Sequence, residues 1–296
     1  MLYVQNTVTL LILWLFANSA YANDEFAGPI LNPTDVTFLL YSQDNSYTEV
    51  TPEFVESSLV EAGAKTYFVI DGLYSNRTTL MAQTVKDDLI TLPNCNVIMV
   101  DWAPLSGYLA FRPSMNDLEL RALYNNVTTY VPAIAREVVN LIESLKIKNI
   151  PLSQVHVIGF SLGAQIGAVV GSEITKKDNE KLGRITGLDP ASFNYQEENV
   201  TAANRLDVTD ATFIDIYHTN RLCDHRFSWK IWNLAFKKDI KACPCKVEAP
   251  EDESICTNLR NSSCTSPVRI GMFISTTIAG NFFVGFKNTT GPQGVA

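Results

Sequence analysis

The chain is short of histidine and of basic residues. Its 296 residues include only three histidines, and 23 Lys and Arg residues stand against 31 Asp and Glu residues, which gives a net charge of −8. This acidic balance argues against a nucleic-acid partner and against an anionic membrane bound by charge alone. Because histidine is the usual general base in enzymes, the sequence offers few candidates for that role. They are His156, His218 and His225.

An apolar run long enough to cross a bilayer is also lacking. The run Val8–Ala17 (VTLLILWLFA) has about half of the roughly 20 residues that a spanning helix needs. The small residues around Ala20 and Ala22 follow it, as in a secretory signal peptide with its cleavage site. We therefore expect a signal peptide over residues 1–22, a secreted, extracellular protein without a transmembrane segment, and a single domain over residues 23–296.

Cysteine is nearly absent from the first two thirds of the chain. Cys95 stands alone there, and the other five begin at Cys223. No cysteine pair is spaced like a zinc site with a following histidine pair, so we expect no metal. In an oxidising compartment the six cysteines predict up to three disulfides, in any of 15 pairings. Five N-x-[ST] sequons also fit a secreted glycoprotein; they begin at Asn76, Asn126, Asn199, Asn261 and Asn288.

Short apolar strands alternate with helical stretches along the chain. This rhythm predicts an α/β fold with a mostly parallel, doubly wound sheet covered on both faces. Pro132 is expected to interrupt the longest helix, and the cysteine-rich stretch Leu222–Cys264 is expected to be a loop. We find no internal repeat. The expected strands are Val36–Ser42, Thr66–Ile70, Val97–Val100, Val155–Phe160, Thr212–Tyr217 and Phe282–Phe286, and the expected helices are Thr79–Ile90, Leu118–Leu145 and Gly163–Thr175.

Gly159–Gly163 (GFSLG) matches the pattern G-x-S-x-G between an apolar strand and a helix rich in small residues. In a nucleophile elbow the serine sits on a strained turn between strand and helix, and the turn needs small neighbours. The alternative is an ordinary strand-to-helix turn in which Ser161 caps the helix. The context of the pattern favours the elbow.

Three further sequence motifs are informative when they are taken together with GFSLGA. They are VIMVDW (Val97–Trp102), RITGLDPA (Arg184–Ala191) and FIDIYHTN (Phe213–Asn220). Together they resemble the pancreatic lipase family of secreted α/β-hydrolases, in particular its branch of insect lipases, phospholipases A1 and yolk proteins. The resemblance runs from Phe38 to Pro292. It implies an α/β-hydrolase fold with a nucleophile elbow, and the C-terminal lipid-binding β domain of the vertebrate members is not expected here.

Site roles follow from this resemblance by position. Ser161 matches the family nucleophile, and Asp189 matches the acid that orients the catalytic histidine. The oxyanion hole is expected to use the backbone N–H groups of Leu162 and Leu73. Where the family usually has histidine before that second donor, this chain has Asp71. Asp71 is then either a solvated turn residue or a carboxylate that opposes the developing oxyanion.

The family's catalytic histidine belongs to a C-x-H-x-R motif, which is best matched by CTNLR (Cys256–Arg260). Asn258 occupies the histidine position, and a rival alignment from Cys264 places Ser266 there. Neither alignment supplies a histidine, and an asparagine amide cannot accept the serine proton. His156 is expected to be structural, and the family does not use the histidine at position 218 as its base. His225 remains as a substitute base.

The resemblance therefore predicts a weak or inactive lipase homologue that binds a lipid or acyl ligand. The alternative is an active carboxylic ester hydrolase, a triacylglycerol lipase or phospholipase A1 in lipid catabolism, with a relocated base such as His225. A third reading is an interaction protein with a vestigial site. If Cys245 pairs with Cys256, the enclosed lid is short and acidic, as in the phospholipase A1 branch. The sequence indicates no cofactor and leaves the oligomeric state open.

Overall fold

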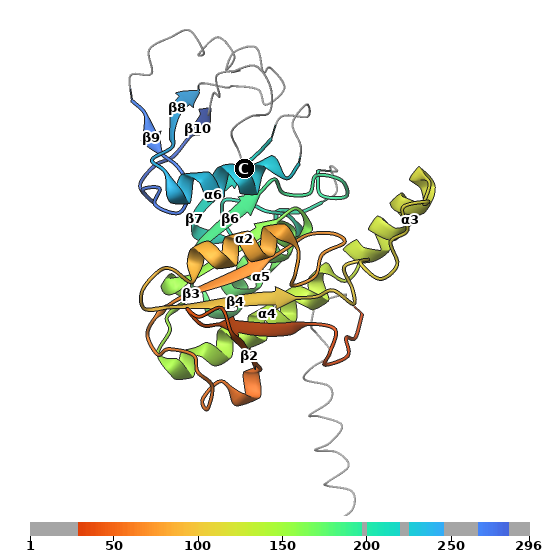
Figure 1. Cartoon of the computed structure of the whole chain (residues 1–296), viewed down its shortest axis with the longest axis horizontal. Coiled ribbons are helices and arrows are strands. Elements are labelled where there is room, and N and C mark those ends of the chain that lie inside the picture. Colours follow the sequence, from red (N-terminus) through yellow and green to blue (C-terminus); the bar gives the residue numbers. More distant parts are fainter. Residues whose placement is uncertain (1–28, 197–199, 220–224, 246–265, 284–296) are drawn as a thin grey trace, which may run out of the picture.

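A seven-stranded sheet forms the centre of the molecule, with the strand order β2-β1-β4-β3-β5-β6-β7 (Figure 1). The computed structural model describes residues 29–196, 200–219, 225–245 and 266–283. Strands β3 to β7 run parallel, whereas β1 is antiparallel to both β2 and β4. The predicted mostly parallel sheet is confirmed. The strands are β1 (Thr37–Tyr41), β2 (Tyr47–Val50), β3 (Lys65–Ile70), β4 (Cys95–Asp101), β5 (Val155–Phe160), β6 (Leu182–Leu188) and β7 (Ala211–Tyr217).

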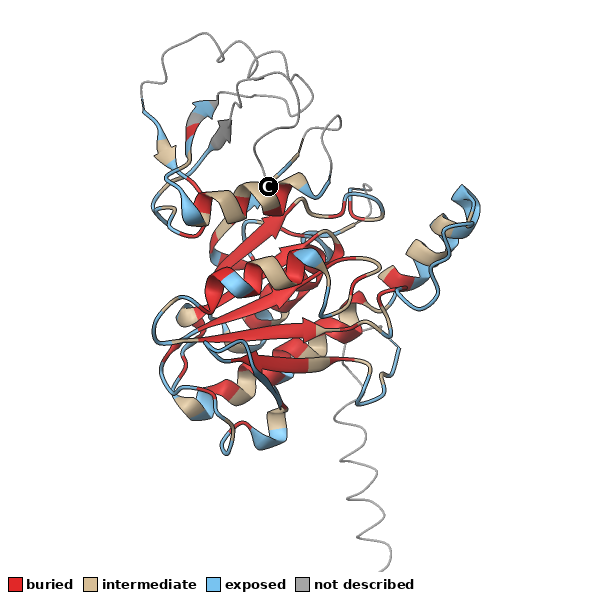
Figure 2. Cartoon of the chain, viewed as in Figure 1, coloured by how far each residue is buried: buried red, intermediate tan, exposed pale blue. Residues whose placement is uncertain are grey.

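Helices cover both faces of this sheet, because successive side chains of a strand point to opposite faces. Phe68 and Ile70 of β3 join the apolar cluster under α4 (Val131–Leu145) and α5 (Leu162–Asp178). The alternate residues of β3 join the cluster under α2 (Leu80–Leu89) and α6 (Phe227–Lys237). Figure 2 shows the strands buried between these layers. Short 3-10 helices occur at Pro52–Phe54, Lys146–Lys148, Leu152–Gln154 and Ala202–Asn204.

The predicted interruption of the long helix is confirmed. α3 (Asp117–Thr128) ends before α4, and Pro132 falls in the first turn of α4, where a missing N–H is tolerated. The start of α3 is held by a capping box in which Asn116 and Glu119 exchange hydrogen bonds. Val127 is the one buried residue of α3, and the helix projects from the body of the molecule (Figure 1).

The prediction of a loop over Leu222–Cys264 is wrong for residues 227–245. α6 forms there because Trp229, Trp232 and Ala235 recur every three residues and bury one side of a helix. After it, β8 (Lys241–Cys245) pairs antiparallel with β9 (Val268–Arg269) and β10 (Asn281–Phe283) in a second, three-stranded sheet. The strand predicted at Phe282–Phe286 therefore begins in this small sheet rather than in the central one.

Cys95 is a free, half-buried thiol. Five other cysteines remain, so at most two disulfides can form within the chain. The expectation of up to three is therefore too high. No helix in residues 29–196, 200–219, 225–245 or 266–283 is long and apolar enough to cross a membrane. The predicted signal peptide over residues 1–22 lies outside the described residues.

Candidate active site

The candidate site is built at the carboxyl ends of the central parallel strands. In the sheet register Ile70 pairs with Gly159, and Leu188 pairs with both Phe160 and Tyr217. The residues that follow these four strand ends therefore meet at one edge of the sheet. They are Asp71 after β3, Ser161 after β5, Asp189 after β6 and His218 after β7. This edge is where open α/β sheets place their ligands.

Ser161 lies on the strained turn that the sequence pattern predicts. Its φ of 54° and ψ of −117° are rare for a residue with a side chain. A Cβ on Gly159 would lie 2.3 Å from the carbonyl oxygen of Gly163, and a Cβ on Gly163 would lie 2.1 Å from that of Ile70. Glycine is therefore required on both sides of the serine. The Ser161 side chain makes no capping hydrogen bond to α5, so the capping alternative does not describe it.

The backbone of Asp189 is tied to the serine turn. Ser161 N–H donates to the carbonyl of Leu188, and Ala191 N–H donates to the carbonyl of Ser161, both at 3.1 Å. The Asp189 carboxylate accepts the hydroxyl of Thr219 at 2.6 Å and its N–H at 3.2 Å. Burial opposes the charged form, but the interactions with His218, His225 and Thr219 outweigh it and hold the pKa of Asp189 well below its ordinary value.

His225 is the histidine that the structure brings to this carboxylate. Its Nδ1 lies 2.5 Å from Asp189 Oδ2, and its ring packs on Phe160, the residue before the serine, with 4.6 Å between ring centroids. When Nδ1–H donates to Asp189, Nε2 is left as the free proton acceptor. Within the described residues no hydrogen bond joins the Ser161 and His225 side chains. Such bonds are often long before a substrate is bound.

The other two histidines have different surroundings from those of His225. His218 Nδ1 is 3.7 Å from Asp189 Oδ1, and its side chain is 67% exposed. His156 is buried in β5, where Nε2 contacts the hydroxyl of Thr186 at 2.8 Å. Burial, together with the positive charge of Arg184, lowers the pKa of His156 well below its ordinary value. A buried neutral imidazole between strands fits the structural role predicted for His156.

The two predicted oxyanion donors lie next to Ser161. Leu162 begins α5, and the first N–H groups of a helix have no partner inside it. Leu73 follows Gly72, which lies against the nucleophile. A Cβ on Gly72 would be 2.8 Å from the Cβ and 3.4 Å from the Oγ of Ser161. The loop after β3 therefore touches the nucleophile. Asp71 is 8% exposed, so of the two alternatives the solvated turn residue does not describe it.

Two features of this site were not anticipated from the sequence, namely the part of Thr219 in holding Asp189 and the packing of Phe160 on His225. The signal for Thr219 was its place directly after His218 in the strand-end segment. Asn258, the residue in the expected histidine position, and the predicted lid between Cys245 and Cys256 lie outside the described residues. Ser266 is described and is exposed.

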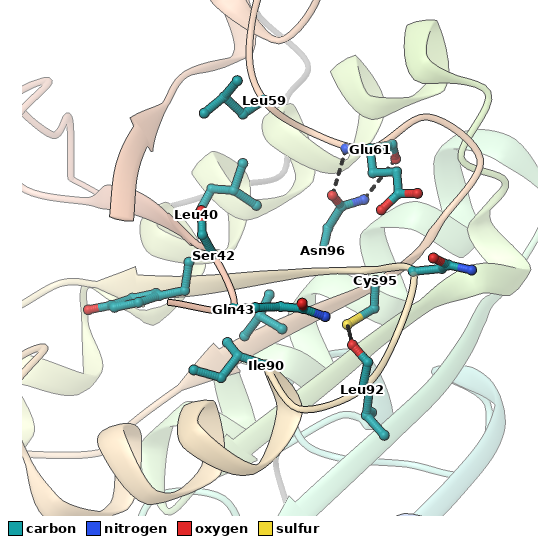
Figure 3. A pocket seen from close by; sticks show the side chains of 12 residues that line it. Leu40, Ser42, Gln43, Leu59, Glu61, Ile90, Leu92, Cys95 and Asn96 are labelled. Carbon is teal, nitrogen blue, oxygen red and sulfur yellow. Dashed lines mark hydrogen bonds between the residues drawn. The ribbon is translucent and has the colours of Figure 1, made fainter. Parts of the chain in front are cut away.

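A separate pocket of about 320 Å³ lies at the opposite edge of the sheet (Figure 3). Its walls include Cys95 and Asn96 at the start of β4 and Ile90 after α2, whereas Ser161 follows the far end of the parallel strand β5. The Asn96 amide is bound to the backbone of Glu61. None of the predicted catalytic residues lines this pocket.

A serine on a strained turn, at the carboxyl edge of a doubly wound sheet, defines an α/β-hydrolase. A family model described as Lipase matches residues 24–228, more than half of the chain. The chain therefore belongs to the lipase family, and the predicted resemblance to pancreatic lipases is confirmed.

Named relatives agree with this assignment. The chain is 31% identical to human pancreatic lipase-related protein 2 over 63% of this chain and 37% of that protein. It is 33% identical to guinea pig (Cavia porcellus) pancreatic triacylglycerol lipase over the same shares. It is also 31% identical to human inactive pancreatic lipase-related protein 1, over 62% of this chain and 36% of that protein. The match thus spans well under half the length of these relatives.

Proposed function

We propose that this protein is a serine carboxylic ester hydrolase of the lipase family in which His225 is the general base. The contact of 2.5 Å between His225 Nδ1 and Asp189 Oδ2 carries the proposal. It supplies the histidine that the C-x-H-x-R motif lacks. The packing of His225 on Phe160 supports the assignment, because it holds the imidazole beside the serine turn.

The proposed reaction follows from the positions of these groups. Ser161 Oγ attacks the ester carbonyl while His225 Nε2 takes its proton, and Asp189 stabilises the imidazolium that forms. The N–H groups of Leu73 and Leu162 bind the negative oxygen of the tetrahedral intermediate. His225 then gives the proton to the departing alcohol. Water, deprotonated by the same imidazole, releases the acid from the acyl-serine.

The proposed substrates are lipid acyl esters, either acylglycerols or phospholipids. Family membership supports this class. We place the activity outside the cell, because the N-terminal segment is typical of a signal peptide. Of the sequons, Asn126 is exposed, which supports a glycan there, and Asn76 is half-buried. We therefore propose a secreted glycoprotein.

The second candidate is a lipase-family protein that binds a lipid or acyl ligand without cleaving it. The observation that favours it is Asn258 in the position of the family's histidine. An asparagine amide has no useful basicity near neutral pH. In that case the contact between His225 and Asp189 is structural.

The first prediction separates the two candidates. We expect secreted wild-type protein to hydrolyse a soluble p-nitrophenyl ester and to react with a fluorophosphonate probe at Ser161. Ser161→Ala abolishes labelling, and His225→Ala lowers turnover by about 10⁴-fold or more, because the serine loses its base. The matched control is His218→Ala, which keeps turnover within about tenfold, since Thr219 and His225 still hold Asp189.

Folded but unreactive wild-type protein that gains activity from Asn258→His would establish the second candidate. Co-purified lipid, identified by mass spectrometry, would then name the ligand.

A further inference from the structure

Asp71 is a buried acidic residue that the proposed mechanism does not use. It directly follows β3, where the chain turns towards Ser161, and 8% of its surface is exposed. Burial raises its pKa, and hydrogen bonds from Thr79, Gly72 and Ala82 counteract part of that rise. Burying a carboxylate costs free energy unless hydrogen-bond donors surround it, so these donors are part of what keeps Asp71 at this place.

Its contacts join the loop after β3 to the start of α2. Gly72 N–H donates to Asp71 Oδ1 at 2.7 Å, and the hydroxyl of Thr79 donates to Oδ2. Thr79 occupies the N-cap position of α2 without making a side-chain capping bond. The carboxylate therefore stands where a capping group belongs, near helix N–H groups and the positive end of the helix dipole. Trp102 Nε1 holds the backbone carbonyl of Asp71 at 3.1 Å.

The next peptide, between Gly72 and Leu73, is held through its carbonyl group. The hydroxyl of Ser75, a buried residue, donates to the carbonyl of Gly72 at 2.5 Å. A peptide bond is planar and trans, so fixing the Gly72 carbonyl sends the N–H of Leu73 in the opposite direction. Among the described residues no acceptor is hydrogen-bonded to that N–H. The Leu73 N–H is therefore a free donor. It lies close to the nucleophile, because the preceding residue, Gly72, is so near Ser161 that a Cβ on it would meet the serine side chain.

We propose that Asp71 and Ser75 are positioning residues for the oxyanion hole, which fix the two peptides flanking Gly72 so that Leu73 N–H faces the oxygen of the reacting ester. The inference rests on the proposed hydrolase function. It also explains how a carboxylate is tolerated at this place. The Asp71 oxygens are directed at Gly72, Thr79 and the start of α2, and those donors offset its charge.

The test compares Asp71→Ala, Asp71→Asn and Ser75→Ala with a matched buried carboxylate, Asp88. Asp88 belongs to α2 and contacts Asn233 and Lys237 of α6. With a soluble p-nitrophenyl ester we expect Asp71→Ala and Ser75→Ala to lower kcat about 10- to 100-fold with little change in KM, as expected when one oxyanion donor is misplaced. Asp71→Asn retains an acceptor for Gly72 N–H and restores most of kcat. Asp88→Asn lowers the Tm but leaves kcat unchanged.

A second readout does not depend on turnover. Amide hydrogen exchange of peptides covering residues 71–82 should be faster in Asp71→Ala than in wild type. Unchanged kcat in Asp71→Ala and Ser75→Ala, an equal loss in Asp88→Asn, or unchanged exchange in this segment would each overturn the inference. If wild-type protein proves inert, the proposed function fails, and the exchange comparison alone decides whether Asp71 fixes the loop. If Asp71→Ala does not fold, Ser75→Ala provides the same comparison of kcat and of exchange.

Discussion

At the residue scale, Asp189 is shared by two histidines with different surroundings. His225 approaches to 2.5 Å and packs on Phe160, whereas His218 stays at 3.7 Å and is largely exposed. Thr219 fixes the carboxylate from a third side. A base needs a defined position beside the serine, and packing against Phe160 gives that position to His225 rather than to His218.

A second buried carboxylate, Asp210, predicts a pH dependence of stability. Burial raises the pKa of Asp210 to about 7, although its Oδ2 accepts the N–H of Asp207 at 2.8 Å. Because the folded pKa lies above the unfolded value, this residue's stabilising contribution is complete below about pH 4 and is lost as the pH rises through about 7. We expect the free energy of unfolding of Asp210→Asn to exceed that of wild type increasingly from pH 5 to pH 8.

The measurement for Asp210 is urea denaturation of both proteins across that pH range. Asp239→Asn, which changes an exposed carboxylate, should follow wild type throughout. A constant difference between Asp210→Asn and wild type would contradict the assignment.

At the element scale, the packing of α5 on β3 depends on Gly163 in the first turn of the helix. A Cβ there would lie 2.1 Å from the carbonyl oxygen of Ile70, a backbone atom that cannot move away easily. We expect Gly163→Ala to lower the free energy of unfolding by about 2–3 kcal/mol or more, because α5 must shift from the sheet. The reactivity of Ser161 with the fluorophosphonate probe should fall with it.

Gly167 is the matched control for Gly163. A Cβ at Gly167 would lie 3.0 Å from a methyl group of Val157, and alanine raises helix propensity by about 1 kcal/mol. Urea denaturation should therefore show a much smaller loss for Gly167→Ala. Equal losses in the two variants would show that the close approach to Ile70 is not the cause.

At the scale of the whole molecule, Arg184 of β6 joins the central sheet to the segment after β9. Its guanidinium makes a bidentate pair with Asp215 of β7, at 2.9 and 2.7 Å. It also donates to the backbone carbonyls of Gly271 and Met272. The buried guanidinium of Arg184 therefore holds together chain segments that are nearly 90 residues apart in the sequence.

We expect Arg184→Leu to lower the free energy of unfolding by about 3–5 kcal/mol, because it leaves the carboxylate of Asp215 buried without its partner. Lys146→Ala is the control, since Lys146 pairs with Glu143 and Asp178 at the surface, where about 1 kcal/mol or less is expected. Urea denaturation measures both. A loss for Arg184→Leu no larger than that for Lys146→Ala would contradict the role of this cation.

Most of the architecture could be predicted because it follows local rules. The apolar strands, the turn glycines around Ser161 and the break at Pro132 depend on residues close in sequence. The helix at 227–237 was missed, because cysteines and charges on either side of it conceal the regular spacing of Trp229, Trp232 and Ala235. The sequence left the place of Asp71 open for a related reason. Its partner Thr79 is eight residues away, and the burial of that pair depends on how α2 returns to the sheet.

The sequence by itself determined the fold class, because the spacing of apolar residues, Gly159 and Gly163 constrains the strand, the turn and the helix directly, and the resemblance of its motifs to those of pancreatic lipases indicated the family. It also indicated Ser161 and Asp189 through motifs that lie within single strand ends. Only the tertiary structure decided which histidine reaches Asp189. His225 is 36 residues from Asp189 along the chain, and its contact depends on the path of the chain after β7 and on the packing of its ring against Phe160.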